Sequence, residues 1–120
     1  MKISIVIPVK EINDYIRESI LHILAMDYDN FEVLIFPDIA SAEVFPKTKI
    51  IATGKVGPSQ KRNLALPYAT GEILAFLDDD AYPKKDWLAK AVSHFENLEE
   101  LYQNDNKSSS LNTGFVCNRD

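Results

Sequence analysis

The sequence predicts an α/β protein with a mainly parallel sheet covered by helices on both faces. Short apolar runs, typical of buried strands, alternate along the chain with segments whose apolar residues recur at helical spacing. This alternation favours parallel pairing, because a helix can carry the chain back to start the next strand in the same direction. The 120 residues and the 46% hydrophobic content suit one packed domain.

The first half of the chain contains three predicted strands and one helix. Asn13 or Asp14 can cap the helix. The side chains at helical spacing that should face the sheet are Ile16, Ile20, Ile23 and Leu24. Apolar runs predict strands over residues 3–7, 31–36 and 49–52.

The second half adds two helices and one strand. Residues 57–59 open a helix with a proline in its first turn, and Pro67 should end or kink it. A fourth strand is predicted over residues 72–77. A last helix begins near residues 83–86, and its inner face is formed by Leu88, Ala91, Val92, Phe95 and Leu98. Polar residues then dominate, and residues 114–117 could begin a further strand.

Composition excludes several functional classes. With 13 basic and 18 acidic residues, the formal net charge is −5 and no basic stripe exists, so nucleic acid is not an expected partner. No run approaches the roughly 18 apolar residues that cross a bilayer, and the opening lacks a signal-peptide pattern. We therefore expect a cytoplasmic location. Cys117 is the single cysteine, which excludes an internal disulfide and a multi-cysteine zinc site.

Three adjacent carboxylates, Asp78, Asp79 and Asp80, directly follow the fourth predicted strand. Strand side chains alternate between faces, so we expect Asp78 and Asp80 to project together and Asp79 to point away. Like charges repel at close range, and a hard divalent cation with oxygen ligands would offset that cost. The run therefore predicts a divalent-cation site, with a merely solvated acidic turn as the alternative interpretation.

Three further residues have the chemistry of a nucleotide site. Lys61 and Arg62 lie near a helix start, where free backbone N–H groups and the helix dipole favour anions. Arg62 can donate a forked pair of hydrogen bonds to phosphate, whereas Lys61 offers a point charge. Asp38 follows the second strand and can accept the N–H of a base or the hydroxyls of a ribose. A solvated helix face and a turn carboxylate are the alternatives.

The positions of these residues predict a strand order. In an order 3-2-1-4, the first and fourth strands flank the point where the order reverses. Ligands of open α/β sheets bind beyond the carboxyl ends of the strands at such a point. We therefore expect Pro8, Asp38 and Asp80 to converge at one edge of the sheet.

Two other α/β classes with acidic sites fit the chain less well. A phospho-acceptor receiver domain needs acids after its first strand and a single Asp after its third, whereas here the acids follow the fourth strand. Phosphatases of the haloacid type place their acidic motif after the first strand. His22 and His94 are single histidines on predicted helices, and we interpret both as structural.

Taken together, these segments resemble family 2 glycosyltransferases of the GT-A type. Residues 3–10 look like that family's opening strand, and residues 15–20 and 28–33 match its first helix and second strand. The most specific stretch covers residues 57–88. It contains Arg-Asn, Ala-x-Gly-Glu, an apolar strand, Leu-Asp-x-Asp and Trp-Leu in that order. The resemblance covers about residues 1–98.

The resemblance implies that residues 1–100 form the nucleotide-sugar-binding half of a GT-A domain. This half would bind a nucleoside-diphosphate sugar, with a UDP-sugar favoured, together with Mg²⁺ or Mn²⁺. Asp78 and Asp80 would belong to the family's DxD motif and hold the metal, with Asp80 favoured for direct contact. The residues that the resemblance implies for the nucleotide are Pro8, Val9, Lys10, Asp38, Lys61, Arg62 and Asp79.

The chain also departs from the family pattern. Pro37 stands where the family usually has another acid, and Lys10-Glu11 replaces the commoner Tyr-Asn pair. Residues 101–120 form a polar tail or the start of the acceptor half, and no residue matches the family's catalytic base. We therefore expect these residues to bind a nucleoside diphosphate without transferring sugar unaided. A fragment, a truncated product and a chain completed by a partner stay open, as does a noncatalytic nucleotide- or metal-binding module.

Overall fold

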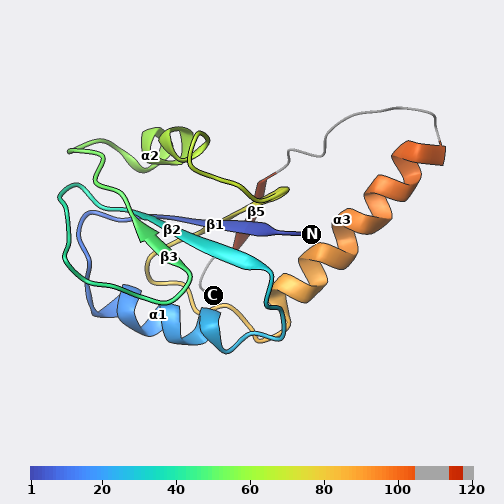
Figure 1. Ribbon diagram of the computed structural model, residues 1–120, viewed down its shortest axis with the longest axis horizontal. Helices are drawn as coiled ribbons and strands as arrows, with labels where there is room; N and C mark the ends of the chain where they lie inside the picture. The colour runs from blue at the N-terminus through green and yellow to red at the C-terminus, as the bar shows by residue number, and fades with distance from the viewer. Residues whose placement is uncertain (105–113, 118–120) are drawn as a thin grey trace.

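The computed structural model describes residues 1–104 and 114–117, and the side chains of residues 1–98 (Figure 1). Its centre is a five-stranded sheet in the order β3-β2-β1-β4-β5, in which every pair is parallel. The predicted order 3-2-1-4 is confirmed, and the further strand at residues 114–117 extends it. The strands are β1 (Ile3–Pro8), β2 (Phe31–Phe36), β3 (Thr48–Ile50), β4 (Ile73–Leu77) and β5 (Gly114–Cys117).

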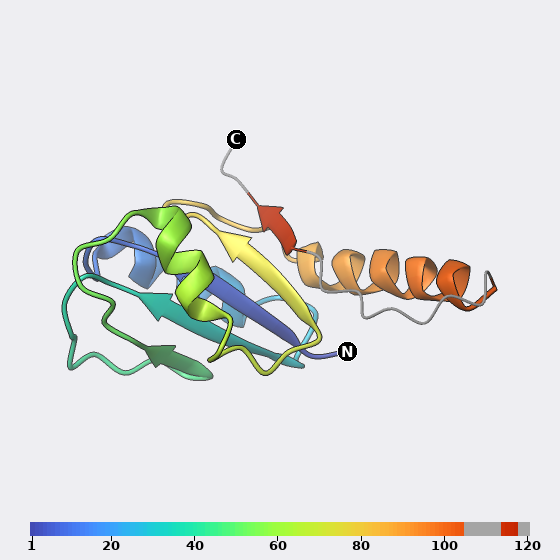
Figure 2. The same ribbon diagram turned by 90° about the horizontal axis from the view of Figure 1, so that it is seen from above.

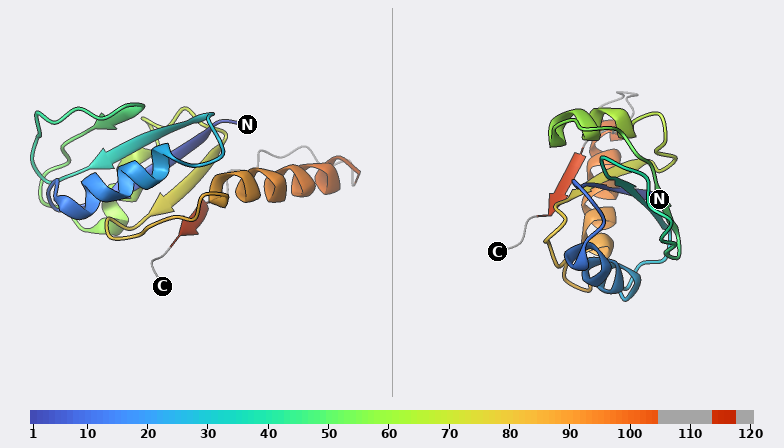
Figure 3. Two further views of the ribbon diagram at one scale, coloured as in Figure 1. Left: turned by 90° about the horizontal axis from the view of Figure 1, so that it is seen from below. Right: turned by 90° about the vertical axis from the view of Figure 1, so that its left-hand side faces the viewer.

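Three helices accompany the sheet, namely α1 (Asp14–Leu24), α2 (Pro58–Ala65) and α3 (Trp87–Asn104). α1 and α2 lie on opposite faces of the sheet, as the end-on view in the right panel of Figure 3 shows. The predicted fold class, a parallel sheet with helices on both faces, is therefore confirmed.

The two faces of the sheet bury different side chains, because successive residues of a strand point to opposite sides. Ile3, Ile5 and Ile7 of β1 are fully buried in the larger core cluster, which also contains side chains of α1 and α3. Val6 packs in a smaller cluster with Ala65 of α2. Each fully buried isoleucine stabilises the fold by about 1.5–3 kcal/mol relative to an exposed one.

Sequence-specific caps fix where the first two helices begin. Asn13 caps α1, and its side-chain oxygen accepts a hydrogen bond from the backbone N–H of Ile16 at 2.9 Å. α2 begins with Gly57 as the N-cap and Pro58 in the first turn, where a missing N–H costs nothing. These starts matter because both helices begin beside the carboxyl ends of the strands, as Figure 2 shows for α2.

A closed polar network joins the amino ends of the central strands. The Ser4 hydroxyl donates to Glu32 at 2.6 Å and accepts from the N–H of Gly71 at 2.8 Å. The N–H and hydroxyl of Thr70 both donate to Glu32, and Lys2 donates to the Thr70 hydroxyl. Burial alone would raise the pKa of Glu32, but the hydrogen bonds from Ser4 and Thr70 outweigh it and lower that pKa. Thr70 and Gly71 of the Ala-Thr-Gly-Glu segment thus serve this network.

The start of α3 packs on the same core cluster as α1, through Leu88, Val92 and Phe95. The helix then projects away from the sheet and ends at Asn104, beyond the boundary predicted at residue 100 (Figure 2). The polar stretch predicted over residues 101–120 lies partly outside the described residues. Within the described part of the chain, no helix is long and apolar enough to span a membrane. The cytoplasmic location stays a prediction.

Candidate functional site

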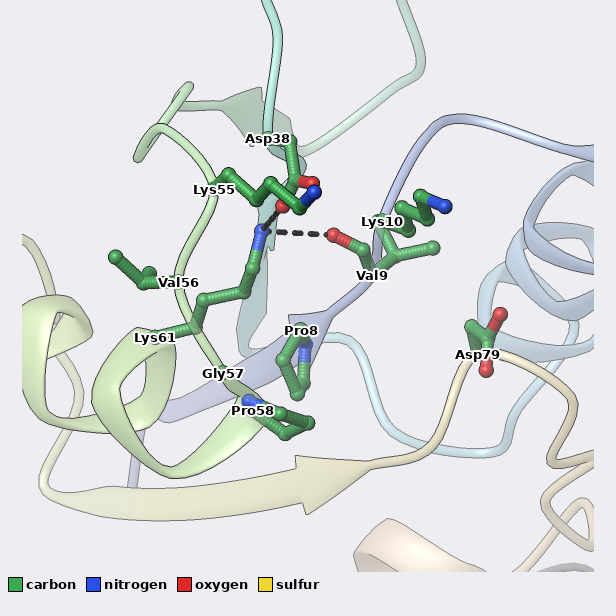
Figure 4. A pocket seen from close by; sticks show the side chains of 10 residues that line it. All are labelled: Pro8, Val9, Lys10, Asp38, Lys55, Val56, Gly57, Pro58, Lys61 and Asp79. Atoms are coloured by element: carbon green, nitrogen blue, oxygen red, sulfur yellow. Dashed lines mark hydrogen bonds and ion pairs between the residues drawn. The ribbon is translucent and has the colours of Figure 1, made fainter.

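A cavity of about 490 Å³ opens at the carboxyl ends of β1 and β2 (Figure 4). The start of α2 and the turn after β4 complete its wall. This volume lies within the range of small-molecule sites, and the position is where open α/β sheets bind ligands. The residues that line it are Pro8, Val9, Lys10, Asp38, Lys55, Val56, Gly57, Pro58, Lys61 and Asp79.

Most of the residues that the sequence assigns to the nucleotide meet in this cavity. They are Pro8, Val9, Lys10, Asp38, Lys61 and Asp79. Arg62, Asp78 and Asp80 are not among the lining residues. Pro8, Asp38 and the turn that carries Asp80 follow neighbouring parallel strands at the carboxyl edge of the sheet, as predicted, and Asp79 is the carboxylate of that turn that lines the cavity. The roles of all these residues stay predictions.

Sequence reasoning missed Lys55 and Val56, which together with Gly57 and Pro58 form one wall of the cavity. The segment follows β3 at the carboxyl edge of the sheet, and its position was the signal that could have identified it. Gly54, just before it, has a φ of +82°, a left-handed conformation that favours glycine. The glycine turns the chain after β3 so that Lys55 and Val56 face the cavity before α2 begins.

Lys61 is buried, with a relative exposure of 3%, and among the described side chains it is the only buried charged one. Its Nζ donates to the backbone carbonyls of Val9 and Phe36, both at 2.9 Å, and to Asp38 Oδ1 at 2.6 Å. An ammonium has three N–H donors, so all of them are used inside the chain. This differs from the free point charge for phosphate that the sequence predicted, because α2 packs its first turn over the ends of β1 and β2.

Asp38 is fixed through its main chain as well as its side chain. Its N–H donates to the carbonyl of Lys10 at 2.9 Å, and its carbonyl accepts from Gly54 at 3.0 Å. Its side chain is 17% exposed and forms the ion pair with Lys61. Asp38 therefore holds together the loops that follow β1, β2 and β3, and it presents its carboxylate to the cavity.

The turn that carries Asp78, Asp79 and Asp80 is attached to α1. The Asn13 amide donates to Asp79 Oδ2 at 3.3 Å, and the buried Ser19 hydroxyl donates to the carbonyl of Ala81 at 2.8 Å. Of the three acids, Asp79 lines the cavity and the other two do not, and the direction of Asp79 relative to Asp78 and Asp80 stays a prediction. β4 ends at Leu77, so strand alternation does not extend into the three acids.

Arg62 and Asp80 differ in how they are paired. Arg62 Nη2 lies 3.6 Å from Asp78 Oδ1, and the side chains are 34% and 43% exposed, so this ion pair contributes little stability. The Arg62 Nε is buried and has no hydrogen-bond partner among the described residues. The Asp80 carboxylate is exposed and makes no hydrogen bond or ion pair within the described part of the chain. Both residues keep hydrogen-bonding or charge capacity for a ligand.

The donor set of this turn suits a hard divalent cation, although it does not form a complete cage. No group of three His, Cys, Asp or Glu side chains among the described residues is arranged to hold a metal. Mg²⁺ commonly takes only one or two protein carboxylates and completes its shell with water and substrate phosphate oxygens. The unpartnered carboxylate of Asp80, beside the weakly paired Asp78, fits that partial donor set.

The parallel sheet matches solved glycosyltransferases of the GT-A type, which is the class to which the comparisons assign this chain. The chain belongs to glycosyl transferase family 2, whose sequence profile matches residues 4–115. This range overlaps the resemblance seen over residues 1–98 from residue 4 onward and extends into β5.

Relatives of known sequence agree with this assignment. An uncharacterized glycosyltransferase of Rickettsia conorii is 34% identical over 110 residues, covering 84% of this chain and 18% of that protein. The poly(ribitol-phosphate) beta-N-acetylglucosaminyltransferase TarS of Staphylococcus aureus is 28% identical over 109 residues, covering 80% of this chain and 19% of that protein. The chain thus spans about a fifth of the length of these relatives.

Solved structures share the fold. A structure of an S. aureus TarS fragment in complex with UDP matches with a TM-score of 0.69 at 26% identity, covering 81% of this chain and 32% of that one. The mannosyltransferase PcManGT of Pyrobaculum calidifontis, in complex with GDP-Man and Mn²⁺, matches with a TM-score of 0.66 at 28% identity. That match covers 76% of this chain and 31% of the mannosyltransferase.

Proposed function

We propose that this chain is the donor-binding part of a glycosyltransferase, which binds a nucleoside-diphosphate sugar together with Mg²⁺ or Mn²⁺. The observation that carries the proposal is the cavity at the carboxyl edge, where Asp38 and Asp79 face one space beside the acidic turn. The complexes of related enzymes with UDP and with GDP-Man and Mn²⁺ support a nucleotide-sugar ligand.

Each part of the site has a chemical task in this proposal. The backbone of Pro8 to Lys10 lines the nucleoside pocket, and Asp38 accepts a hydrogen bond from the base. Asp79 accepts from the ribose hydroxyls, for which a carboxylate is a suitable acceptor. Arg62, which is partly exposed and lies beside the acids, donates to the nucleotide through its guanidinium group.

Asp80 and Asp78 are the residues that would hold the cation. When bound, the cation neutralises the negative charge that grows on the leaving diphosphate. Arg62 limits the repulsion among the acids, since it lies beside Asp78. Asn13 keeps Asp79 within the cavity wall through its amide. We leave the base that activates the acceptor unassigned.

Calorimetry with UDP, GDP and their sugars, with and without Mn²⁺, tests the proposal. We expect one-site binding of UDP or GDP that tightens about tenfold or more with Mn²⁺, in the range of a close charge interaction. Absence of saturable nucleotide binding would contradict the proposal, and equal affinity with and without Mn²⁺ would remove its metal component. UDP-sugars are the favoured donors, so UDP should bind more tightly than GDP.

A noncatalytic nucleotide-binding module of the same fold would bind equally well, so a second measurement separates the two functions. The bound donor is incubated with Mn²⁺ and free sugar is measured over time. Slow Mn²⁺-dependent release of sugar, absent with Asp80→Asn, is the result expected of a transferase donor site. Unchanged donor over the same period favours the noncatalytic module.

A further inference from the structure

We infer that Lys61 is a positioning residue, which orients the Asp38 carboxylate and thereby selects a nucleobase that carries a ring N–H. The inference rests on the proposed function, because it places the base of a nucleotide in the cavity. It starts from the burial of Lys61, whose relative exposure is 3%. Lysine is almost never fully buried unless it is paired, since an isolated buried charge is very costly.

The ammonium of Lys61 is fully used by the protein itself. Its three acceptors are the carbonyls of Val9 and Phe36 and the carboxylate of Asp38, at 2.9, 2.9 and 2.6 Å. Because an ammonium has three donors, a phosphate could bind only by displacing one of them. The short contact to Asp38 is a charge-assisted hydrogen bond, which is stronger than a hydrogen bond between neutral groups. The geometry thus assigns Lys61 to Asp38 rather than to the diphosphate.

Asp38 in turn has little freedom. Lys10 and Gly54 hold its main chain, and Lys61 holds Oδ1. Oδ2 is the oxygen left for a ligand, and Figure 4 shows the Asp38 side chain at the cavity with the Lys61 ammonium against it. A lone carboxylate could rotate about its side-chain bonds, whereas this one is held in one orientation by an immobile donor.

An ionised carboxylate accepts hydrogen bonds and donates none. Uracil and guanine both present a ring N–H with an adjacent carbonyl, so either can donate to Oδ2 of Asp38. Cytosine and adenine present an unprotonated ring nitrogen at the corresponding edge. This nitrogen and the carboxylate are both acceptors, so they cannot form a hydrogen bond with each other. The positioned carboxylate therefore favours uracil or guanine over cytosine, and binding of UDP, GDP and CDP distinguishes these bases.

The Asp38→Asn variant gives the inference a signature that a purely structural lysine would not produce. Lys61 can donate only to an acceptor, so it should hold the oxygen of the introduced amide and turn the amide nitrogen toward the cavity. That nitrogen donates to the ring nitrogen of cytosine, and the preference should move from UDP or GDP toward CDP. Without Lys61 the amide is free to flip, so a double variant with Lys61→Met should lose any preference.

The experiment measures dissociation constants of UDP, GDP, CDP and uridine with Mn²⁺ for the parent chain and four variants. The variants are Lys61→Met, Asp38→Asn, their combination, and Lys49→Met as a control for an exposed lysine outside the cavity. We expect the parent to prefer UDP or GDP to CDP by about tenfold or more, as for a hydrogen bond to a charged group. Lys61→Met should lower this preference about fivefold, within the range of couplings between contacting residues. Lys49→Met should leave it unchanged.

Two outcomes in the variants would overturn the inference while nucleotide binding persists. Equal weakening of all three nucleotides by Lys61→Met, with no shift toward CDP in Asp38→Asn, shows a structural lysine. A smaller affinity gap between UDP and uridine, with the base preference intact, shows a phosphate ligand. If Lys61→Met does not fold, the shift toward CDP in Asp38→Asn decides alone. If the parent chain binds no nucleotide, the proposed function fails and the inference with it, whereas binding without base preference defeats the inference only.

Discussion

The two edges of the central sheet use polar residues in opposite ways. At the amino edge, Lys2, Ser4, Glu32 and Thr70 satisfy one another in a closed network. At the carboxyl edge, Lys61 is fully paired, but Asp80 is unpartnered and the Arg62 Nε has no acceptor among the described residues. Both edges belong to β1, β2 and β4, so the difference does not come from the strands.

The difference suits the amino edge of the sheet to stabilising the fold and the carboxyl edge to binding a ligand. A buried network whose members are all satisfied stabilises one structure, whereas unsatisfied polar groups cost free energy unless a ligand completes them. Lys61 is a fully satisfied polar group, although it lies at the carboxyl edge. We therefore expect substitutions at the amino edge to change folding, and substitutions in the acidic turn to change ligand binding with little effect on folding.

The largest effect is expected for Gly71→Ala at the amino edge. A Cβ at Gly71 would lie 2.6 Å from the N of Ser4 and 2.8 Å from the carbonyl oxygen of Lys2, so the backbones of β1 and β4 would have to separate. We expect the free energy of unfolding to fall by about 3 kcal/mol, as for severe overpacking. Urea unfolding measures it. Gly57→Ala is the control, since no atom lies within 4 Å of its Cβ; it should cost about 1 kcal/mol or less.

Glu32→Gln should give the next largest effect, a loss of about 2 kcal/mol at neutral pH, as for a broken hydrogen-bond network around a charged group. The pKa of Glu32 is lowered in the folded state, so its carboxylate stabilises the fold above the ordinary value of 4.5. That stabilisation is lost as the pH falls through the lowered native value. Unfolding free energies of the variant and the parent should therefore converge in acid.

The pH dependence has its own control. Glu43 also has a lowered pKa, because Arg17 hydrogen-bonds to it, but this pair lies on the surface. Glu43→Gln should therefore change stability less than Glu32→Gln does. A pH-independent difference between Glu32→Gln and the parent would contradict the assigned role of Glu32.

Asp80→Asn should affect binding and leave folding unchanged. The substitution keeps the shape of the side chain and removes the charge that a cation needs. Affinity for UDP with Mn²⁺ should fall about tenfold, which corresponds to about 1.4 kcal/mol, and affinity without metal should not change. Asp29→Asn, an exposed acid near the amino edge, is the matched control. Equal losses with and without Mn²⁺ would show that Asp80 acts in another way.

The fold could be predicted from the sequence because it depends on periodicity. The isoleucines at positions 3, 5 and 7 and the helical spacing of Ile16, Ile20 and Ile23 are local patterns that identify strands and a helix, whereas the strand order was predicted from the polar residues that follow strand ends. The end of β4 at Leu77 was also predicted, but the hydrogen bonds that attach the acidic turn to α1 were not. Beyond the end of the strand, side chains need not alternate between faces. Hydrogen bonds from Asn13 and Ser19 hold the turn there instead.

The burial of Lys61 could not be predicted from the sequence. A lysine in the first turn of a short polar helix is usually solvated, and α2 is such a helix. Its burial depends on where α2 lies over β1 and β2, which is a property of the tertiary structure. The cavity wall at Lys55 and Val56 was missed for the same reason, because the wall forms only when the loop after β3 reaches the ends of β1 and β2.

The central claim is that the cation and nucleotide bind at the carboxyl edge and not at the amino edge. NMR spectra of the chain with UDP and Mn²⁺, compared with UDP and diamagnetic Mg²⁺, test it most directly. We predict that Mn²⁺ broadens the amide signals of Asp78, Asp79 and Asp80 and those near Asp38, while the signals of Glu32 and Thr70 stay sharp. Broadening centred on Glu32 and Thr70, or spread evenly over the chain, would contradict the claim.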